Sequence, residues 1–167
     1  MIITTENEIR DTVLRAKQNG LTVGFVPTMG ALHSGHSRLI STANMHCDFV
    51  VVSVFVNPTQ FGPNEDFAKY PRSIDSDRQI AEQAGARVIF HPNMSVIYPR
   101  KYGISLSLPD VASRWESDFR PTHFAGVMGV CLRLFNLVTP DAVFFGQKDL
   151  QQLRVIETMV QDLRLGI

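Results

Sequence analysis

Two histidines, His33 and His36, lie three positions apart with Gly35 between them, in a polar stretch over residues 27–37. The apolar run before this stretch, residues 21–26, predicts a buried strand, and a helical pattern follows it. N–H groups at a helix start favour negative charge, glycine permits close approach, and imidazoles can donate to phosphate oxygens. The arrangement favours a nucleotide-phosphate site. A histidine pair can instead be solvated or structurally bonded, and two are too few for a structural zinc site.

Further polar residues that suit a small ligand follow other predicted strands. Gln60 comes after the strongest strand, and its amide can both donate and accept hydrogen bonds. The last predicted strand ends at Gly146, after which Lys148 can bring a positive charge to a phosphate. Asp149 can cap the next helix or accept hydrogen bonds from ribose hydroxyls, and Gln152 lies one turn into that helix. Because ligands of α/β proteins bind at the carboxyl ends of parallel strands, we expect these residues to share one crevice.

Three ionisable residues near predicted helix starts have roles that the pattern leaves open. Arg120 and His123 precede a long apolar helix and can form an anion site, although such residues in a loop are often only solvated. Asp77, in the first turn of another predicted helix, can complement the helix dipole or bind magnesium near a triphosphate.

Predicted strands and helices alternate along the chain. Strands are expected at 21–26, 48–57, 87–92 and 140–145, with an exposed strand at 104–108. Helices are expected at 37–43, 74–84 and 127–138, with a short helical turn at 93–98. The first helix is expected to run from a cap at Thr5 or Asn7 to residue 19. The last helix is expected to run from 149 to 162 or 163, with Gly166 as its stop. The alternation predicts one α/β domain over 1–167, a Rossmann-like doubly wound parallel sheet with helices on both faces.

The composition excludes some classes of partner. The 16 basic and 16 acidic residues cancel, so neither a nucleic-acid surface nor a membrane surface is expected. No apolar stretch approaches membrane-spanning length, and the first residues lack the pattern of a signal peptide. Cys47 and Cys131 lie in apolar segments, which is typical of reduced thiols. We therefore expect a cytoplasmic location.

Five blocks of the sequence, in order, resemble the pantothenate synthetase family, also called pantoate–β-alanine ligases. The blocks are residues 26–36, 54–61, 70–72, 120–127 and 145–152. The His-x-Gly-His element alone would indicate only the wider nucleotidyltransferase superfamily. The resemblance implies a Rossmann-like domain of the HxGH type, which in this family is followed by a smaller C-terminal lid. We expect residues 1–167 to be the first domain, without that lid.

The resemblance also implies an activity, namely ATP-dependent condensation of pantoate with β-alanine through a pantoyl adenylate, releasing pyrophosphate and AMP. It further implies Mg²⁺ with the ATP and a homodimer. Two alternatives remain, another nucleotidyltransferase of the HxGH type and a non-catalytic nucleotide-binding or dimerisation module.

The resemblance assigns roles to individual residues of this sequence. The residues expected to take part in catalysis are His33, His36 and Lys148. Those expected to contact ATP are Pro27, Thr28, Met29, Gly30, His33, Gly35, His36, Gly146, Lys148 and Asp149. Those expected to contact pantoate are Gln60, Gln152, Arg120 and His123, and the candidate for magnesium is Asp77.

Overall fold

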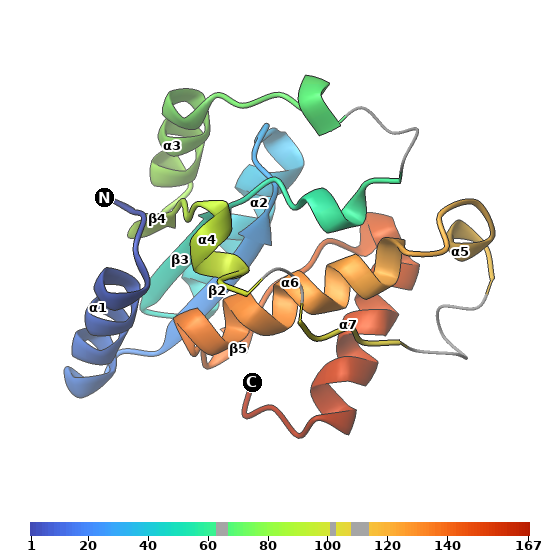
Figure 1. Cartoon of the computed structure of the whole chain (residues 1–167). Coiled ribbons are helices and arrows are strands. Elements are labelled where there is room, and N and C mark those ends of the chain that lie inside the picture. The colour runs from blue at the N-terminus through green and yellow to red at the C-terminus, as the bar shows by residue number, and fades with distance from the viewer. Residues whose placement is uncertain (63–66, 101–102, 108–113) are drawn as a thin grey trace.

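Five parallel strands form the centre of the structure, a computed structural model that describes residues 1–62, 67–100, 103–107 and 114–167 (Figure 1). The strands are β1 (Ile2–Ile3), β2 (Val23–Thr28), β3 (Phe49–Val54), β4 (Val88–Phe90) and β5 (Ala142–Val143). Their order in the sheet is β1-β4-β3-β2-β5, and all the pairs are parallel. The chain runs from β2 to β3 and β4 on one side and returns to place β5 on the other side of β2. In open α/β sheets, ligands usually bind at such a reversal, which here lies at the carboxyl end of β2.

Helices cover both faces of this sheet, as predicted. One face carries α2 (Ser34–His46) and α3 (Ile74–Gln83). The other carries α1 (Glu6–Gln18) and α6 (His123–Val138), with α4 (Met94–Ile97) and α7 (Leu150–Asp162) packed against α6. Val50 and Val52 belong to the first core and Val51 to the second, because successive strand residues point to opposite faces. All three are fully buried, which explains why β3 is continuously apolar instead of alternating.

Four short elements complete the connections: η1 (Pro58–Gln60), η2 (Phe67–Lys69), α5 (Glu116–Phe119) and η3 (Gln147–Asp149). Most predicted elements are confirmed with shifted ends. Thr5 caps α1, and its hydroxyl accepts the N–H of Glu8 at 3.4 Å. The predicted helix at 37–43 is longer, Ser34–His46, while the predicted strand at 140–145 shortens to Ala142–Val143.

Three details of the predicted fold are wrong or missing. Residues 104–107 form no strand, because alternation alone supplies no neighbouring strand to pair with, and residue 108 lies outside the described part. The predicted stop at Gly166 is also displaced, since α7 ends at Asp162 and Arg164 takes the left-handed turn with φ 50°. The edge strand β1 was not predicted, because two isoleucines are too short to give a pattern.

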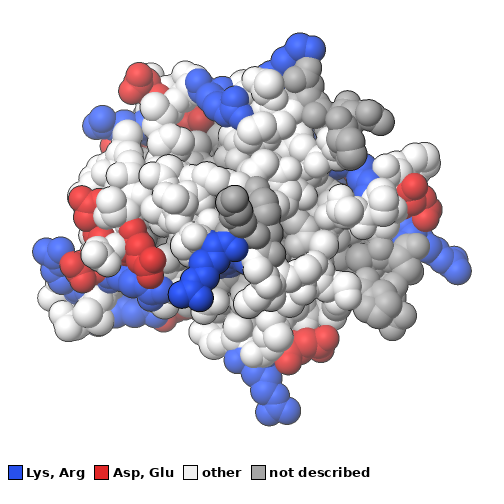
Figure 2. All heavy atoms as spheres, in the orientation of Figure 1, with Lys and Arg blue, Asp and Glu red and all other residues white. Residues whose placement is uncertain are grey.

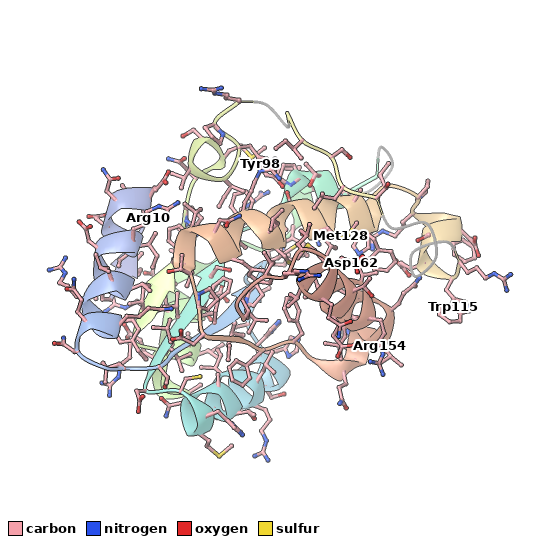
Figure 3. All side chains as sticks on the ribbon, turned by 90° about the horizontal axis from the view of Figure 1, so that it is seen from below. Arg10, Tyr98, Trp115, Met128, Arg154 and Asp162 are labelled. Carbon is pink, nitrogen blue, oxygen red and sulfur yellow. The ribbon has the colours of Figure 1, made fainter. Side chains whose placement is uncertain are left out.

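Charged side chains of both signs lie on the surface, and the cysteines and most of the large apolar side chains lie in the core. Basic and acidic side chains are interspersed on the face seen in Figure 2, and no helix within the described ranges is long and apolar enough to cross a membrane. Met128 lies in the core while Trp115 projects outward, 73% exposed (Figure 3). Cys47 and Cys131 are free and buried, and burial raises the pKa of the Cys131 thiol to about 12.

Candidate active site

The polar stretch after β2 forms a tight loop that leads directly into α2. Gly30 and Ala31 have positive φ, 86° and 52°. The hydroxyl of Thr28 supports the turn, donating to the carbonyl of Ser53 at 2.6 Å and accepting the N–H of Gly30 at 3.2 Å. A Cβ on Gly30 would lie 2.8 Å from a carboxylate oxygen of Asp77. Glycine is therefore required at position 30 by its φ and by the space around it.

His33 and His36 cap the helix they begin, each through Nδ1 of its ring. His33 is the N-cap of α2, and its Nδ1 accepts the N–H of Gly35 at 3.0 Å. The Nδ1 of His36 accepts the N–H of His33 at 3.3 Å. Because an accepting Nδ1 carries no proton, each neutral ring holds its proton on Nε2. The two rings, with centroids 4.2 Å apart, therefore form a pair of Nε2–H donors.

Electrostatics favour the neutral form of His36. Burial, and next the neighbouring His33, lowers the pKa of His36 from its ordinary 6.5, while Asp77 acts in the opposite direction and Lys148 adds a smaller lowering. At neutral pH the ring is therefore mainly uncharged. This agrees with an Nδ1 that accepts the backbone hydrogen bond of the cap.

Asp77, in the first turn of α3, contacts this loop from 46 positions further along the chain. Its side chain is 2% exposed. Oδ2 accepts the N–H of Ala31 at 3.1 Å, and Oδ1 accepts the N–H of Leu32 at 2.7 Å. Neither role predicted for Asp77, dipole partner or magnesium ligand, included this contact. This contact was missed because both of its partners are main-chain groups, which no local pattern indicates.

A second polar loop follows β3 and carries Gln60 on η1. Its centre is Asn57, which is fully buried and was not predicted as a site residue. Asn57 Nδ2 donates to Gln60 Oε1 and to the carbonyl of Gly126, both at 3.1 Å. Asn57 Oδ1 accepts from the hydroxyl of Tyr98 at 2.9 Å and from that of Thr59 at 3.0 Å. Since Oε1 of Gln60 is held in this way, the amide nitrogen is the group that Gln60 can offer to a ligand.

Arg120 and His123 hold the same loop from the start of α6. Arg120 Nη2 and His123 Nδ1 both donate to the backbone carbonyl of Gln60, at 2.9 and 3.1 Å. Arg120 also pairs with Glu116 at 2.9 Å. Because His123 donates through Nδ1, its ring carries a proton on Nδ1, whereas the two loop histidines carry theirs on Nε2. Both residues line a cavity, but the partner that they share is the backbone carbonyl of Gln60, and pantoate contact stays a prediction.

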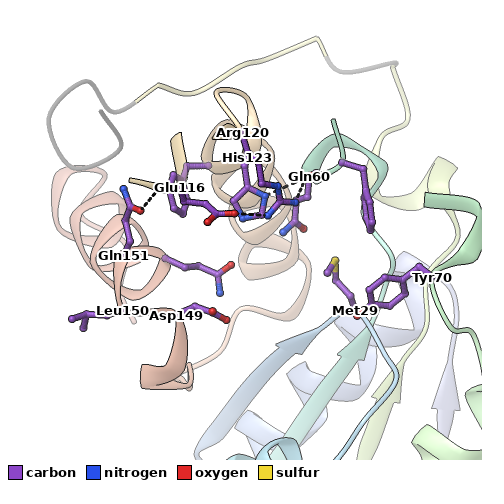
Figure 4. Close-up of a pocket in the computed structure, with 12 residues that line it drawn as sticks. Met29, Gln60, Tyr70, Glu116, Arg120, His123, Asp149, Leu150 and Gln151 are labelled. Carbon is purple, nitrogen blue, oxygen red and sulfur yellow. Dashed lines mark hydrogen bonds and ion pairs between the residues drawn. The ribbon is translucent and has the colours of Figure 1, made fainter. Parts of the chain in front are cut away.

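Two adjoining cavities of about 430 and 460 Å³ lie at the carboxyl ends of the strands. Residues that line both are Met29, Gln60, Tyr70, Asp149 and Gln152. The first is also lined by Arg120 and His123, which point toward Gln60 in Figure 4. The second is also lined by Pro27, Thr28, His33, Gly35, His36, Gly146 and Lys148.

Only two of the predicted site residues, Gly30 and Asp77, line neither of these two cavities. Asp77 instead lines a smaller hollow of about 220 Å³, which shares Met29 with the two cavities. Asp149 occupies the N-cap position of α7, yet its side chain makes no capping hydrogen bond. The capping hydrogen bond predicted for Asp149 is therefore not formed, and its contact with ribose hydroxyls stays a prediction.

A sequence profile described as pantoate-beta-alanine ligase matches residues 1–167. The chain belongs to the pantoate–β-alanine ligase family. Two solved structures show how far the likeness to this family extends. Pantothenate synthetase from Thermus thermophilus is 43% identical, with a TM-score of 0.92 over 99% of this chain. Pantoate-beta-alanine ligase from Francisella tularensis, complexed with beta-gamma ATP and beta-alanine, is 36% identical with a TM-score of 0.93 over 99% of this chain.

The match covers only part of those pantoate–β-alanine ligase structures. The present chain spans 58% of the Thermus thermophilus chain and 64% of the Francisella tularensis chain. The α/β sheet with helices on both faces is thus the architecture that this family member shares with them.

Proposed function

We propose that this chain is the ATP- and pantoate-binding part of a pantoate–β-alanine ligase, which condenses pantoate with β-alanine through a pantoyl adenylate. The observation that carries the proposal is the meeting of two kinds of group in adjoining cavities: the donor pair His33 and His36, and the amides of Gln60 and Gln152. A nucleotidyltransferase with a phosphate-bearing acceptor would need cations where these amides lie. The amides therefore favour the ligase over that alternative.

The first step needs alignment and donors instead of a nucleophilic side chain. A carboxylate oxygen of pantoate attacks the α-phosphorus of ATP, the bond to the bridging oxygen breaks, and pyrophosphate leaves with the electron pair. Charge rises on the phosphate oxygens, where the Nε2–H groups of His33 and His36 and the ammonium of Lys148 can stabilise it. The neutral His36 suits this role because it donates a hydrogen bond and keeps its proton.

In the second step the amine of β-alanine attacks the carbonyl carbon of the adenylate. AMP leaves with the electron pair, and the nitrogen loses a proton as the amide forms. The amides of Gln60 and Gln152 can hold the hydroxyl and carboxylate groups of pantoate without adding negative charge beside the phosphates. Val127 and Val130 of α6 add an apolar wall to the same cavity, which suits the carbon skeleton of pantoate.

We infer that Mg²⁺ accompanies ATP and neutralises charge on the triphosphate. Among the residues that the structure describes, no three His, Cys, Asp or Glu side chains gather as a metal site. The residues present therefore fit a metal held mainly by phosphate oxygens and water, as is usual for magnesium with nucleotides. Asp77 as a protein ligand for this metal stays a prediction.

We also propose that the protein is a cytoplasmic homodimer. The dimer is supported by the family resemblance and by Trp115 and Phe119, large apolar side chains that are 73% and 86% exposed. The two free, buried cysteines support a reducing compartment. Sedimentation equilibrium of this chain tests the dimer, and a monomer mass at micromolar concentration contradicts it.

Isotope exchange between pyrophosphate and ATP tests the proposed chemistry. Incorporation of labelled pyrophosphate into ATP that requires pantoate supports the ligase. ATP binding by calorimetry without any exchange indicates a nucleotide-binding module. Exchange that requires a phosphorylated acceptor in place of pantoate contradicts the proposal.

A histidine variant tests the donor role within the same assay. His36→Ala should lower pantoate-dependent exchange by about 10²–10³-fold, as expected for loss of one donor to transition-state charge. The matched control is His46→Ala, on the last turn of the same helix. Its exposed ring forms a hydrogen bond with the carbonyl of Thr42 through Nδ1 at 2.8 Å, and the ring centroid lies 6.2 Å from that of Phe144. An exchange rate of His36→Ala within about twofold of wild type removes His36 from the mechanism.

A further inference from the structure

A buried carboxylate lies directly behind the loop that presents the two donor histidines. Asp77 is 2% exposed and accepts two successive backbone N–H groups, from Ala31 and Leu32, one on each oxygen. A charged acceptor makes these hydrogen bonds stronger than those between neutral groups. The carboxylate thus holds the segment that immediately precedes His33.

This segment needs support because its backbone conformation is unfavourable. Ala31 has φ 52°, a left-handed conformation that a residue with a Cβ seldom adopts. The preceding Gly30 has φ 86°, so the two residues together turn the chain sharply. That turn directs the N–H groups of Ala31 and Leu32 toward Asp77 and sets the direction in which α2 begins.

The next residues transmit this placement to the donor pair. The N–H of His33, one residue after Leu32, is the group that fixes the ring of His36. His33 in turn is fixed by the N–H of Gly35. A shift of the backbone at Leu32 therefore moves both Nε2–H groups relative to the cavity.

We propose that Asp77 is the positioning residue of the phosphate-binding loop, holding His33 and His36 in their donor geometry before any ligand or metal binds. The consequence for ATP binding rests on the proposed function, whereas the consequence for the loop itself does not. Two simpler roles compete with this one. A dipole partner would act equally well from Asp75, which is exposed in the same first turn of α3. If Asp77 acted only as a magnesium ligand, replacing it would leave the metal-free loop unchanged.

The test compares Asp77→Asn with Asp75→Asn in the whole 167-residue chain, without nucleotide or metal. Both variants remove one negative charge from the same helix turn, so their difference isolates the contact with the loop. Hydrogen exchange of the Ala31 and Leu32 amides should become about tenfold faster or more in Asp77→Asn and stay as in wild type in Asp75→Asn. Long-range ¹H–¹⁵N spectra of the imidazoles should show the Nε2–H form of both histidines in wild type and its loss in Asp77→Asn.

Several outcomes overturn the proposal. Unchanged amide exchange and unchanged histidine spectra in Asp77→Asn refute it, and equal effects of both variants assign the role to the helix dipole. An Asp77→Asn variant with a normal loop but a changed Mg²⁺ dependence of ATP binding assigns it to the metal. If Asp77→Asn does not fold, the wild-type chain decides: a scalar coupling across the hydrogen bond from the Leu32 amide nitrogen to the Asp77 carboxyl carbon supports the proposal, and its absence refutes it.

Discussion

Replacing Gly126 by alanine should separate α6 from η1 and displace Gln60. A Cβ at position 126 would lie 2.4 Å from the carbonyl oxygen of Thr59, 2.7 Å from its carbonyl carbon and 3.0 Å from the nitrogen of Gln60. Ordinary contacts begin near 3.4 Å, so the two elements would have to move apart by about 1 Å. All three obstructing atoms are backbone, and no side-chain rotation can relieve the overlap.

A matched variant on the same helix isolates the cost of this overlap. Overpacking of this kind costs about 1–3 kcal/mol, while alanine in place of glycine inside a helix gains about 1 kcal/mol. Gly129→Ala makes the same gain, but its Cβ would meet only Nη1 of Arg133, at 3.4 Å. The free energy of unfolding of Gly126→Ala should therefore lie about 1–3 kcal/mol below that of Gly129→Ala.

The same displacement should reach the proposed ligand site. Gly126 also accepts a hydrogen bond from Asn57, the residue that orients the side chain of Gln60. A misplacement of about 1 Å can lower activity by about 10²-fold. Urea unfolding of both variants and calorimetry with ATP and pantoate are the assays. Equal stability of the two variants would refute the steric reasoning, and equal pantoate affinity would refute the link to Gln60.

Three further predictions concern buried polar and ionisable groups. Asn57→Ala leaves several buried groups without their partner and should lower the free energy of unfolding by about 2–3 kcal/mol, whereas urea midpoints equal to wild type would contradict the network. For His36, a folded-state pKa below 6.5 means that the unfolded state binds the proton more readily. Its contribution to stability is therefore complete above pH 6.5 and is lost as the pH falls through the lowered pKa. Melting temperatures measured from about pH 5 to 8 should fall less steeply toward acid pH in His36→Gln than in wild type. Identical slopes in the two proteins would exclude the effect. Cys131, with a pKa of about 12 and 5% exposure, lines the larger cavity and should still react with a thiol reagent far more slowly in the native chain than in urea; equal labelling rates would contradict this prediction.

The sequence predicted the strands and the residues at their carboxyl ends well, for a simple physical reason. Strands buried on both faces leave continuous apolar runs, and the polar residues that interrupt them must lie in loops at the sheet edge. His33, Gln60 and Lys148 were found in this way, and the structure places all three at adjoining cavities.

Helix and strand ends were less predictable because side chains act there in uncommon ways. The start of α2 was predicted three residues late, because histidine is seldom counted among N-cap residues, yet His33 caps this helix through Nδ1. The strand predicted at 140–145 is longer than the observed strand because Phe144 and Phe145 are apolar and were counted as strand residues. In the structure these two side chains line the larger cavity instead of extending the strand.

The hydrogen bonds of Asn57 and Asp77 could not be found by any local pattern, although Asp77 itself was predicted as a candidate for magnesium. Their roles depend on hydrogen bonds to residues tens of positions away, such as Gly126 for Asn57 and Leu32 for Asp77. Such contacts exist only once the loops have been brought together by the sheet. Nothing in the spacing of either residue distinguishes it from an ordinary turn former or helix-start carboxylate.

The reciprocal caps at His33 and His36 also determine which ions the pair can select. A transition metal such as nickel or zinc needs a lone pair on a ring nitrogen. Here the Nδ1 lone pair of each ring is used by a backbone N–H, and Nε2 carries the proton. Metal binding would require each ring to exchange its tautomer and break a helix cap. The backbone thus selects anions over d-block cations at a pair of histidines whose residue types alone would suit either.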